Sequence, residues 1–168
     1  MKRITHLLLV VTTLILSACG GTKLLPVNLD SKQPLDGYQY FYITPTGEKS
    51  GTTTSIYNTG YGAYGTTQQK STNPADVISG FLIKRGYIRI AELPGLHPEE
   101  TLIINYGESG KRRFGIWGAY TLEVTIQFLS VTTNEILCTV SGEGLGSTEA
   151  DDIRVAINRC LQAVFEGQ

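Results

Sequence analysis

The sequence predicts an α+β domain, in which a mixed or antiparallel sheet of four to five strands has two helices packed on one face. Three observations support this prediction. Apolar and polar residues alternate through residues 121–141, two stretches have the apolar spacing of a helix, and short aromatic or β-branched runs stand between them. The chain of 168 residues, with 14 basic and 15 acidic side chains, is long enough for one such core.

The first half of the domain contains one strand, a long polar segment and one helix. Residues 38–43 are aromatic and β-branched, which predicts a strand. Residues 46–72 are rich in Thr, Ser, Gly, Tyr and Gln, and they predict an irregular excursion or a Thr-rich hairpin that turns at its centre. A helix is expected to begin at Asn73, the N-cap, with Pro74 in its first position, and to end at Gly86.

The second half predicts the rest of the sheet and a final helix. Residues 87–90 and 102–106 predict strands, the second so continuously apolar that both of its faces should be covered. Residues 107–118 predict a second irregular or hairpin segment, and the alternation over 121–141 then predicts a β-hairpin. The last helix is expected to begin within 147–152, where hydroxyl residues can cap it and three acidic side chains favour the positive end of its dipole.

The N-terminus has the order of a signal peptide. Met1-Lys2-Arg3 is basic, and residues 7–16 form an apolar run that is too short to span a membrane. The residues that follow, Leu16-Ser17-Ala18-Cys19-Gly20, resemble the lipobox of bacterial lipoproteins. The resemblance implies cleavage between Ala18 and Cys19, a diacylglycerol on the Cys19 thiol, and a fatty acid such as palmitate on its new amine. A plain signal peptide with an incidental cysteine, or a buried N-terminal helix, is the alternative interpretation.

These features divide the chain into a signal peptide at 1–18, a lipidated tether at 19–36 and a single α+β domain at 37–168. Two glycines, Gly20 and Gly21, follow Cys19 where an aspartate would favour retention in the inner membrane. We therefore expect a lipid-anchored protein of the bacterial cell envelope, at the outer membrane in preference to the inner one.

Three stretches of the domain carry a resemblance to known lipoproteins. Residues 73–78, 104–110 and 146–154 resemble a group of bacterial lipoproteins of unknown function. The order of elements is also similar to periplasmic α/β lipoprotein domains, including the curli-secretion lipoprotein and the lipoprotein activators of penicillin-binding proteins. The resemblance covers most of residues 38–166. It implies the fold, but its motifs have no established chemistry.

The residues that catalysis or cofactor binding would require are missing. Without residues 1–18, acidic side chains exceed basic ones by about three, so no polybasic surface for nucleic acid is expected. His97 stands alone in a loop, next to carboxylates without zinc-site spacing. Asp151 and Asp152 are explained by the helix dipole, and residues 107–112 match a phosphate-binding loop poorly. The sequence therefore predicts a protein that is not an enzyme, with no metal and no cofactor.

Two cysteines remain, Cys138 on the inward face of a strand and Cys160 on the inward face of the last helix. An exported protein could join them in a disulfide if the helix packs on that strand. The alternative is two reduced, buried thiols that behave as small apolar side chains. The sequence leaves both open and slightly favours the reduced state.

Two segments break the core pattern and are candidates for partner binding, because aromatic and Arg side chains on excursions are enriched at binding surfaces. If both project from one end of the sheet, they form a single composite patch. The alternative is that the first is disordered and that Trp117 packs at the edge of the core. The candidate residues are Tyr57, Tyr61 and Tyr64 in the first segment and Arg112, Arg113, Phe114 and Trp117 in the second.

Three classes of function fit these observations. The first is a membrane-anchored, non-catalytic protein-interaction or scaffold module of the cell envelope. The second is a glycan- or cell-wall-binding lipoprotein, since Tyr and Trp faces suit sugar rings. The third is a subunit of a secretion pore assembly, by analogy with the curli-secretion lipoprotein. The third is the weakest, because residues 51–71 lack the alternating apolar pattern of membrane strands.

Overall fold

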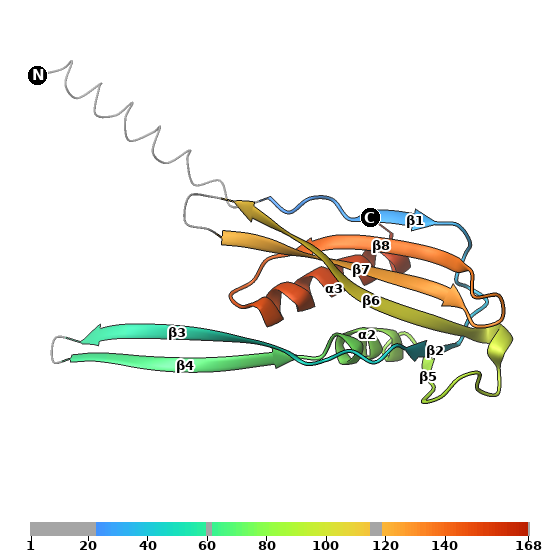
Figure 1. Ribbon diagram of the computed structural model, residues 1–168, viewed down its shortest axis with the longest axis horizontal. Helices are drawn as coiled ribbons and strands as arrows, with labels where there is room; N and C mark the ends of the chain where they lie inside the picture. The colour runs from blue at the N-terminus through green and yellow to red at the C-terminus, as the bar shows by residue number, and fades with distance from the viewer. Residues whose placement is uncertain (1–22, 60–61, 115–118, 168) are drawn as a thin grey trace, which may run out of the picture.

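The computed structural model describes residues 23–59, 62–114 and 119–167, and for residues 53–59 and 62–68 it describes the backbone alone. The described chain forms a six-stranded mixed sheet, a separate two-stranded hairpin and two helices (Figure 1). The elements are β1 (Asn28–Ser31), β2 (Tyr40–Ile43), β3 (Lys49–Thr59), β4 (Gly62–Thr72), α2 (Pro74–Ile83), β5 (Ile88–Arg89), the short 3-10 helix η1 (Pro98–Glu100), β6 (Thr101–Phe114), β7 (Ala119–Ser130), β8 (Ile136–Gly144) and α3 (Glu149–Phe165).

The α+β class is confirmed, but the strand number of four to five is wrong. The main sheet has the order β1-β8-β7-β6-β2-β5, and β3 and β4 form a second sheet. The main sheet is mixed: β2 runs parallel to both β5 and β6, and the other neighbouring strands are antiparallel. The additional strand of the main sheet is β1, which is short and mostly polar, so hydrophobic periodicity does not reveal it.

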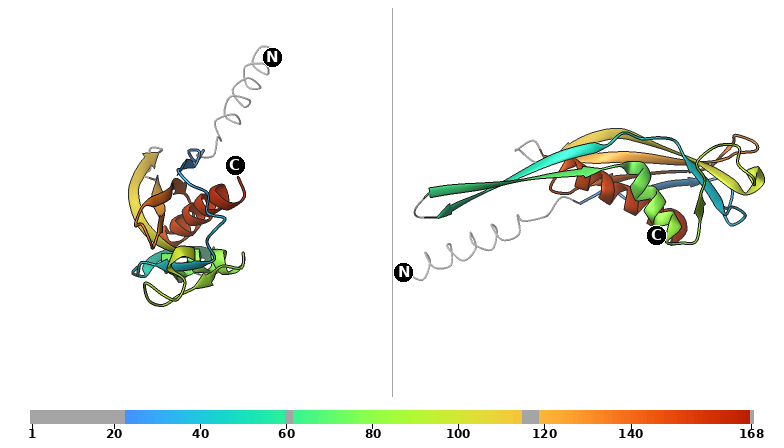
Figure 2. Two further views of the ribbon diagram at one scale, coloured as in Figure 1. Left: turned by 90° about the vertical axis from the view of Figure 1, so that its right-hand side faces the viewer. Right: turned by 90° about the horizontal axis from the view of Figure 1, so that it is seen from below.

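The helices cover one face of the sheet (Figure 2). α3 packs along β7 and β8, and α2 packs beside α3. The core between these layers contains side chains with no exposed surface, among them Phe41, Ile104, Phe128 and Ile157. On β6, Ile103 is partly exposed on the face away from the helices, so the prediction that this strand is covered on both faces is wrong.

Both helices begin where the sequence predicts. The Asn73 side chain accepts a hydrogen bond from the Ala75 N–H at 3.0 Å and caps α2. Thr148 caps α3 by accepting from the Asp151 N–H at 3.2 Å. Gly86, just beyond α2, has a φ of 88°, a conformation that glycine adopts without strain.

Two long hairpins project toward the same end of the molecule, which we call the hairpin end (Figure 1). β3 and β4 are paired from Lys49↔Thr72 to Thr59↔Gly62, which confirms the hairpin interpretation of residues 46–72. β6 and β7 form the other hairpin, with a bulge between Glu108 and Gly110. Residues 107–114 are therefore a continuation of β6, whereas 115–118 lie outside the described residues.

The N-terminal segment is packed on the domain. The described part of the predicted tether, residues 23–36, includes β1, which pairs antiparallel with β8 from Asn28↔Ser141 to Ser31↔Cys138. The partly buried Val27 and Leu29 side chains pack against the core. This differs from the expected free tether at 19–36, because alternating apolar side chains over 27–29 attach the segment to the sheet.

Candidate functional site

At the hairpin end, a buried carboxylate holds the N-terminal segment. Glu143 lies near the end of β8, between two glycines, and its side chain is only 6% exposed. Its carboxylate receives two hydrogen bonds from the guanidinium of Arg112 on β6, at 2.6 Å from Nε and 2.7 Å from Nη2. The same carboxylate accepts the N–H of Leu25 at 3.0 Å. The hydrogen bonds from Arg112 lower the pKa of Glu143 to about 2, so this group is ionised at neutral pH.

Arg159 completes this arrangement from α3. Its Nη2 donates to the carbonyl oxygen of Leu25 at 2.7 Å, and its Nη1 donates to the carbonyl oxygen of Glu143. Arg112 also reaches the carbonyl oxygen of Lys23 at 3.5 Å. Side chains from β6, β8 and α3 thus converge on the main chain of residues 23–25. We call Arg112, Glu143 and Arg159 the N-terminal clasp.

Ion pairs fasten the root of the β3–β4 hairpin to the rest of the domain. Lys49 Nζ lies 2.9 Å from Glu108 Oε1 on β6, and Lys70 Nζ lies 2.9 Å from Asp151 Oδ2 in the first turn of α3. Hydrogen bonds from Ser147 and Lys70 lower the pKa of Asp151 to about 2. Asp151 therefore has two roles. Its charge lies near the positive end of the α3 dipole, and its ion pair with Lys70 holds β4 against the start of α3.

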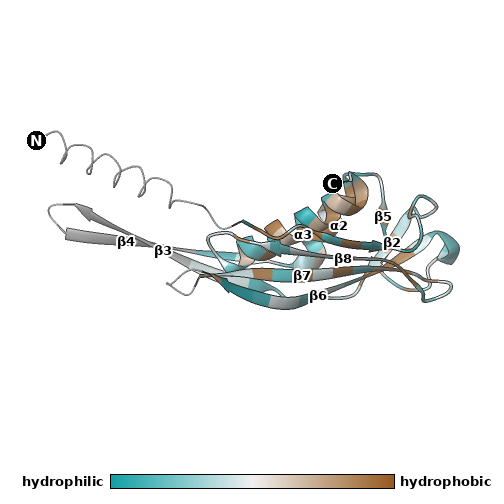
Figure 3. Ribbon diagram, turned by 90° about the horizontal axis from the view of Figure 1, so that it is seen from above, coloured by the Kyte–Doolittle hydropathy of each residue, from teal (hydrophilic) through white to brown (hydrophobic). Residues whose placement is uncertain are grey.

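Close backbone packing fixes the same contact. A Cβ atom on Gly51 of β3 would lie 2.7 Å from the Cβ of Thr148, so only glycine permits this approach. Nearby, Lys111 on β6 pairs with Glu149 at 3.1 Å and lies 4.8 Å from the centre of the Tyr120 ring. The distal half of β6 is hydrophilic, in contrast to the apolar residues of β7 and α2 (Figure 3). The hairpin end is thus polar and built from matched charges.

The structure assigns different roles to the predicted partner-binding residues of the second segment. Arg112 belongs to the clasp, and its guanidinium is bonded to Glu143, so it is not a free binding group. Arg113 is exposed and Phe114 is partly exposed at the end of β6. Trp117 lies outside the described residues.

The predicted tyrosines of the first segment lie at the tip of the other hairpin. Tyr57 and Tyr64 stand directly opposite each other across β3 and β4, although their side chains are not described. Tyr61 lies outside the described residues. Both excursions project toward the same end, which is the arrangement that a composite surface requires (Figure 1).

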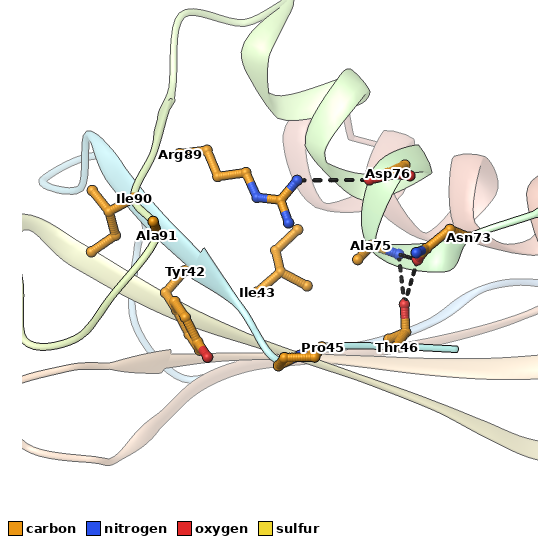
Figure 4. Close-up of a pocket in the computed structure, with 10 residues that line it drawn as sticks. All are labelled: Tyr42, Ile43, Pro45, Thr46, Asn73, Ala75, Asp76, Arg89, Ile90 and Ala91. Carbon is orange, nitrogen blue, oxygen red and sulfur yellow. Dashed lines mark hydrogen bonds and ion pairs between the residues drawn. The ribbon is translucent and has the colours of Figure 1, made fainter. Parts of the chain in front are cut away.

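A pocket of about 470 Å³ lies beside the start of α2 (Figure 4). Asp76 and Arg89 face each other in it at 3.7 Å, and the Thr46 hydroxyl accepts the Ala75 N–H at 3.0 Å. The lining includes the hydroxyls of Tyr42 and Thr46 and the carboxylate of Asp76, and no histidine or cysteine is among its described residues. His97 is stacked on Tyr40, with the ring centres 4.8 Å apart.

The two cysteines are buried and free. The Cys160 sulfur packs against Gly142, whereas Cys138 lies four residues earlier on β8, beside Val164 and Phe165. Cys160, on α3, thus lies against a different part of β8 from Cys138. Burial raises the pKa of Cys138 to about 11 and that of Cys160 to about 12. The sequence left a disulfide and a pair of reduced thiols open, and the structure has the reduced thiols.

Among residues 23–59, 62–114 and 119–167, no three His, Cys, Asp or Glu side chains gather as a metal site would require. In the described part of the chain, no helix has the length and apolar character needed to cross a bilayer.

The clasp is the part of this site that the sequence prediction missed. The sequence predicts no role for Glu143 or Arg159, and it predicts partner binding for Arg112. One local signal was present: Gly142-Glu143-Gly144 places a carboxylate between two glycines at the end of a strand, where neighbouring chain can approach closely. Alternation at Val27 and Leu29 was the corresponding signal in the N-terminal segment.

Neither a protein-family model nor a curated protein sequence matches the chain. Among solved structures, the fold is similar to that of PelC from Paraburkholderia phytofirmans, which was solved as a dodecamer. A single-substitution variant of that dodecamer aligns with a TM-score of 0.50 at 14% identity, over 82% of this chain and 96% of the PelC chain. The unsubstituted dodecamer aligns with a TM-score of 0.47 at 16% identity, over 86% and 98% of the two chains. At these identities, the likeness concerns the fold alone.

Proposed function

We propose that the protein is a lipid-anchored lipoprotein of the bacterial cell envelope, attached through Cys19, that acts as a non-catalytic interaction or scaffold module. The observation that supports this most is the geometry of the hairpin end. Both hairpins project there, and the clasp holds the N-terminal segment at the same end. An anchor at Cys19 would therefore place two long hairpins beside the membrane, in a position to contact neighbouring envelope proteins. The glycines after Cys19 favour the outer membrane.

The partner that fits the β3–β4 hairpin best is another copy of the chain. The hairpin forms a sheet of its own, and its strands have no neighbour in the main sheet. Charged residues and proline normally prevent edge strands from pairing with another chain. Residues 50–69 contain neither. A two-stranded hairpin is marginally stable by itself in water, so pairing with a neighbour would stabilise it. PelC, which shares the fold, assembles as a dodecamer, and we extend self-association to this protein.

Native mass and partner capture test this proposal together. The mature chain should sediment as a homo-oligomer. A variant that lacks residues 56–65, with Ser55 and Thr66 joined by Asn-Gly, should sediment as a monomer and unfold in one cooperative thermal transition. Capture from detergent-solubilised envelopes should recover a defined partner that Arg113→Glu weakens. Monomeric behaviour of the mature chain, together with no recovered envelope protein, would contradict the proposal.

A subunit of a pore-forming assembly is the second candidate. It is favoured by the projection of two hairpins at the end where the N-terminal segment is held. This candidate predicts detergent-extracted rings of high mass that conduct ions in planar bilayers. Rings without conductance would leave the scaffold function and exclude the pore.

A further inference from the structure

We infer that Arg112, Glu143 and Arg159 orient the domain on a lipid surface, by fixing where the N-terminal segment leaves it. This inference rests on the proposed attachment at Cys19 and deepens it. The surface of the protein that faces the membrane is the hairpin end, and it contacts the headgroup layer of the bilayer in which the lipid is anchored.

The clasp binds main-chain atoms of the N-terminal segment. Glu143 accepts the Leu25 N–H, Arg159 donates to the Leu25 carbonyl oxygen, and Leu25 itself is 52% exposed. The contacts therefore do not depend on the Leu25 side chain. Just beyond it, the partly buried Val27 packs against the core and prevents the segment from sliding along the sheet. Residues 23–27 are thus held in one position.

The clasp fixes where the chain leaves the domain at the hairpin end. After the clasp, the segment runs along β8 as β1, and the N–H groups of Lys32 and Gln33 donate to the Leu137 carbonyl oxygen. Opening the clasp frees residues 23–26, because Val27 and β1 keep their own contacts with the domain. The free chain between Cys19 and Val27 then reaches about 28 Å in place of about 14 Å, so the hairpin end is no longer held against the headgroups.

The number of residues before the clasp keeps the anchor close. Three residues separate Lys23 from Cys19, so the four Cα–Cα steps between them reach at most about 14 Å. A lipid on Cys19 therefore brings the hairpin end against the headgroups while the clasp is closed. Lys23 and Arg113 are exposed at this end and suit an anionic surface.

Fluorescence quenching can measure this orientation. The full chain carries a fluorophore either at Ser109→Cys, on the β6–β7 hairpin, or at Leu96→Cys, in the loop before η1 at the other end of the sheet. Cys138 and Cys160 are buried and should not react. The protein is placed in phosphatidylethanolamine–phosphatidylglycerol vesicles that contain a headgroup quencher. Quenching at position 109 should exceed that at position 96 several-fold.

Two variants open the clasp in different ways. Glu143→Gln with Arg159→Gln removes two of its three charges, and Leu25→Pro removes the N–H that Glu143 accepts while keeping all three side chains of the clasp. Each should lower the quenching ratio toward one. Leu25→Ala keeps the N–H and should retain the ratio. If the double variant fails to fold, Leu25→Pro still decides the result.

The matched charge control is Glu135→Gln with Arg154→Gln, which makes the same substitutions outside the clasp. Equal quenching at both positions in the unmodified clasp, or an unchanged ratio in Leu25→Pro, would overturn the inference. Palmitate labelling and sedimentation with membranes test the lipidation separately. If the chain is not lipidated, the proposed anchor fails, and the clasp is tested by coupling the Cys19 thiol to a maleimide lipid in the same vesicles, with a fluorescent amino acid in place of cysteine at position 109 or 96.

Discussion

Replacing Glu143 by Gln is the sharpest test of the clasp, because it preserves the size of the side chain and removes its charge. In the folded protein, this carboxylate faces the Arg112 guanidinium at 2.6 Å and accepts the Leu25 N–H. Glutamine leaves Arg112 without its counter-charge in a partly buried position. We expect the free energy of unfolding at neutral pH to fall.

The pKa of Glu143 gives the magnitude. The hydrogen bonds from Arg112 lower it from 4.5 to about 2, which corresponds to about 3 kcal/mol in favour of the folded state at neutral pH. The Arg112 side chain is 39% exposed, so water replaces part of the lost interaction in the variant. We therefore expect a loss of about 1–3 kcal/mol.

The pH dependence gives the sign. A carboxyl group whose pKa is lower in the folded state stabilises the protein above its unfolded pKa, and that stabilisation disappears as the pH falls through the folded value. The difference between the wild type and Glu143→Gln should thus be complete above about pH 5 and shrink toward pH 2. Urea unfolding at several pH values, followed by circular dichroism, measures it. Amide hydrogen exchange should become faster at Leu25 in the variant.

Glu135→Gln is the control, because Glu135 is an exposed turn residue. It should change the free energy of unfolding by less than about 0.5 kcal/mol. A difference for Glu143→Gln that stays constant between pH 7 and pH 3, or that does not exceed the control, would refute the role assigned to the carboxylate.

Three further predictions concern the anchor, the core and the thiols. Cys19→Ser should abolish palmitate labelling and membrane sedimentation, while the thermal transition of the domain stays unchanged; retained labelling would refute the assignment. Gly144→Ala should destabilise the protein by about 2 kcal/mol or more, because the new Cβ would lie 1.9 Å from a backbone oxygen of α3, whereas Gly107→Ala meets no atom within 4 Å and should not destabilise by this mechanism. Burial raises the pKa of Cys138 and Cys160 to about 11 and 12, so both should react with a thiol reagent at pH 8 only after unfolding; fast reaction of the native protein would contradict their packing.

Features that depend on near neighbours in the chain could be predicted from the sequence. The Asn73-Pro74 start of α2 is a local capping pattern, and the structure reproduces it. The hairpin of β7 and β8 follows from alternation over 121–141, and the helix capped by Thr148 follows from hydroxyl and acidic residues in sequence. The α+β class follows from the order of these elements, because each must bury its apolar face against another.

The candidate site could be predicted only in part. Arg112 was expected at a binding surface because Arg beside aromatic residues is typical of one. The structure instead places it on Glu143, 31 residues away along the chain. The strand number was wrong for a related reason, since β1 is polar and short, and its place at the edge of β8 depends on pairing with residues more than a hundred positions later.

The sequence by itself determined the helix starts, the β7–β8 hairpin and the class of fold, because each depends on residues a few positions apart. Only the tertiary structure decided which end of the domain the N-terminal segment leaves. Leu25 and Glu143 are 118 residues apart, and no periodic pattern connects them. They meet only in the folded sheet. There, Arg112 from β6 binds the Glu143 carboxylate, and Arg159 from α3 binds the Glu143 carbonyl oxygen.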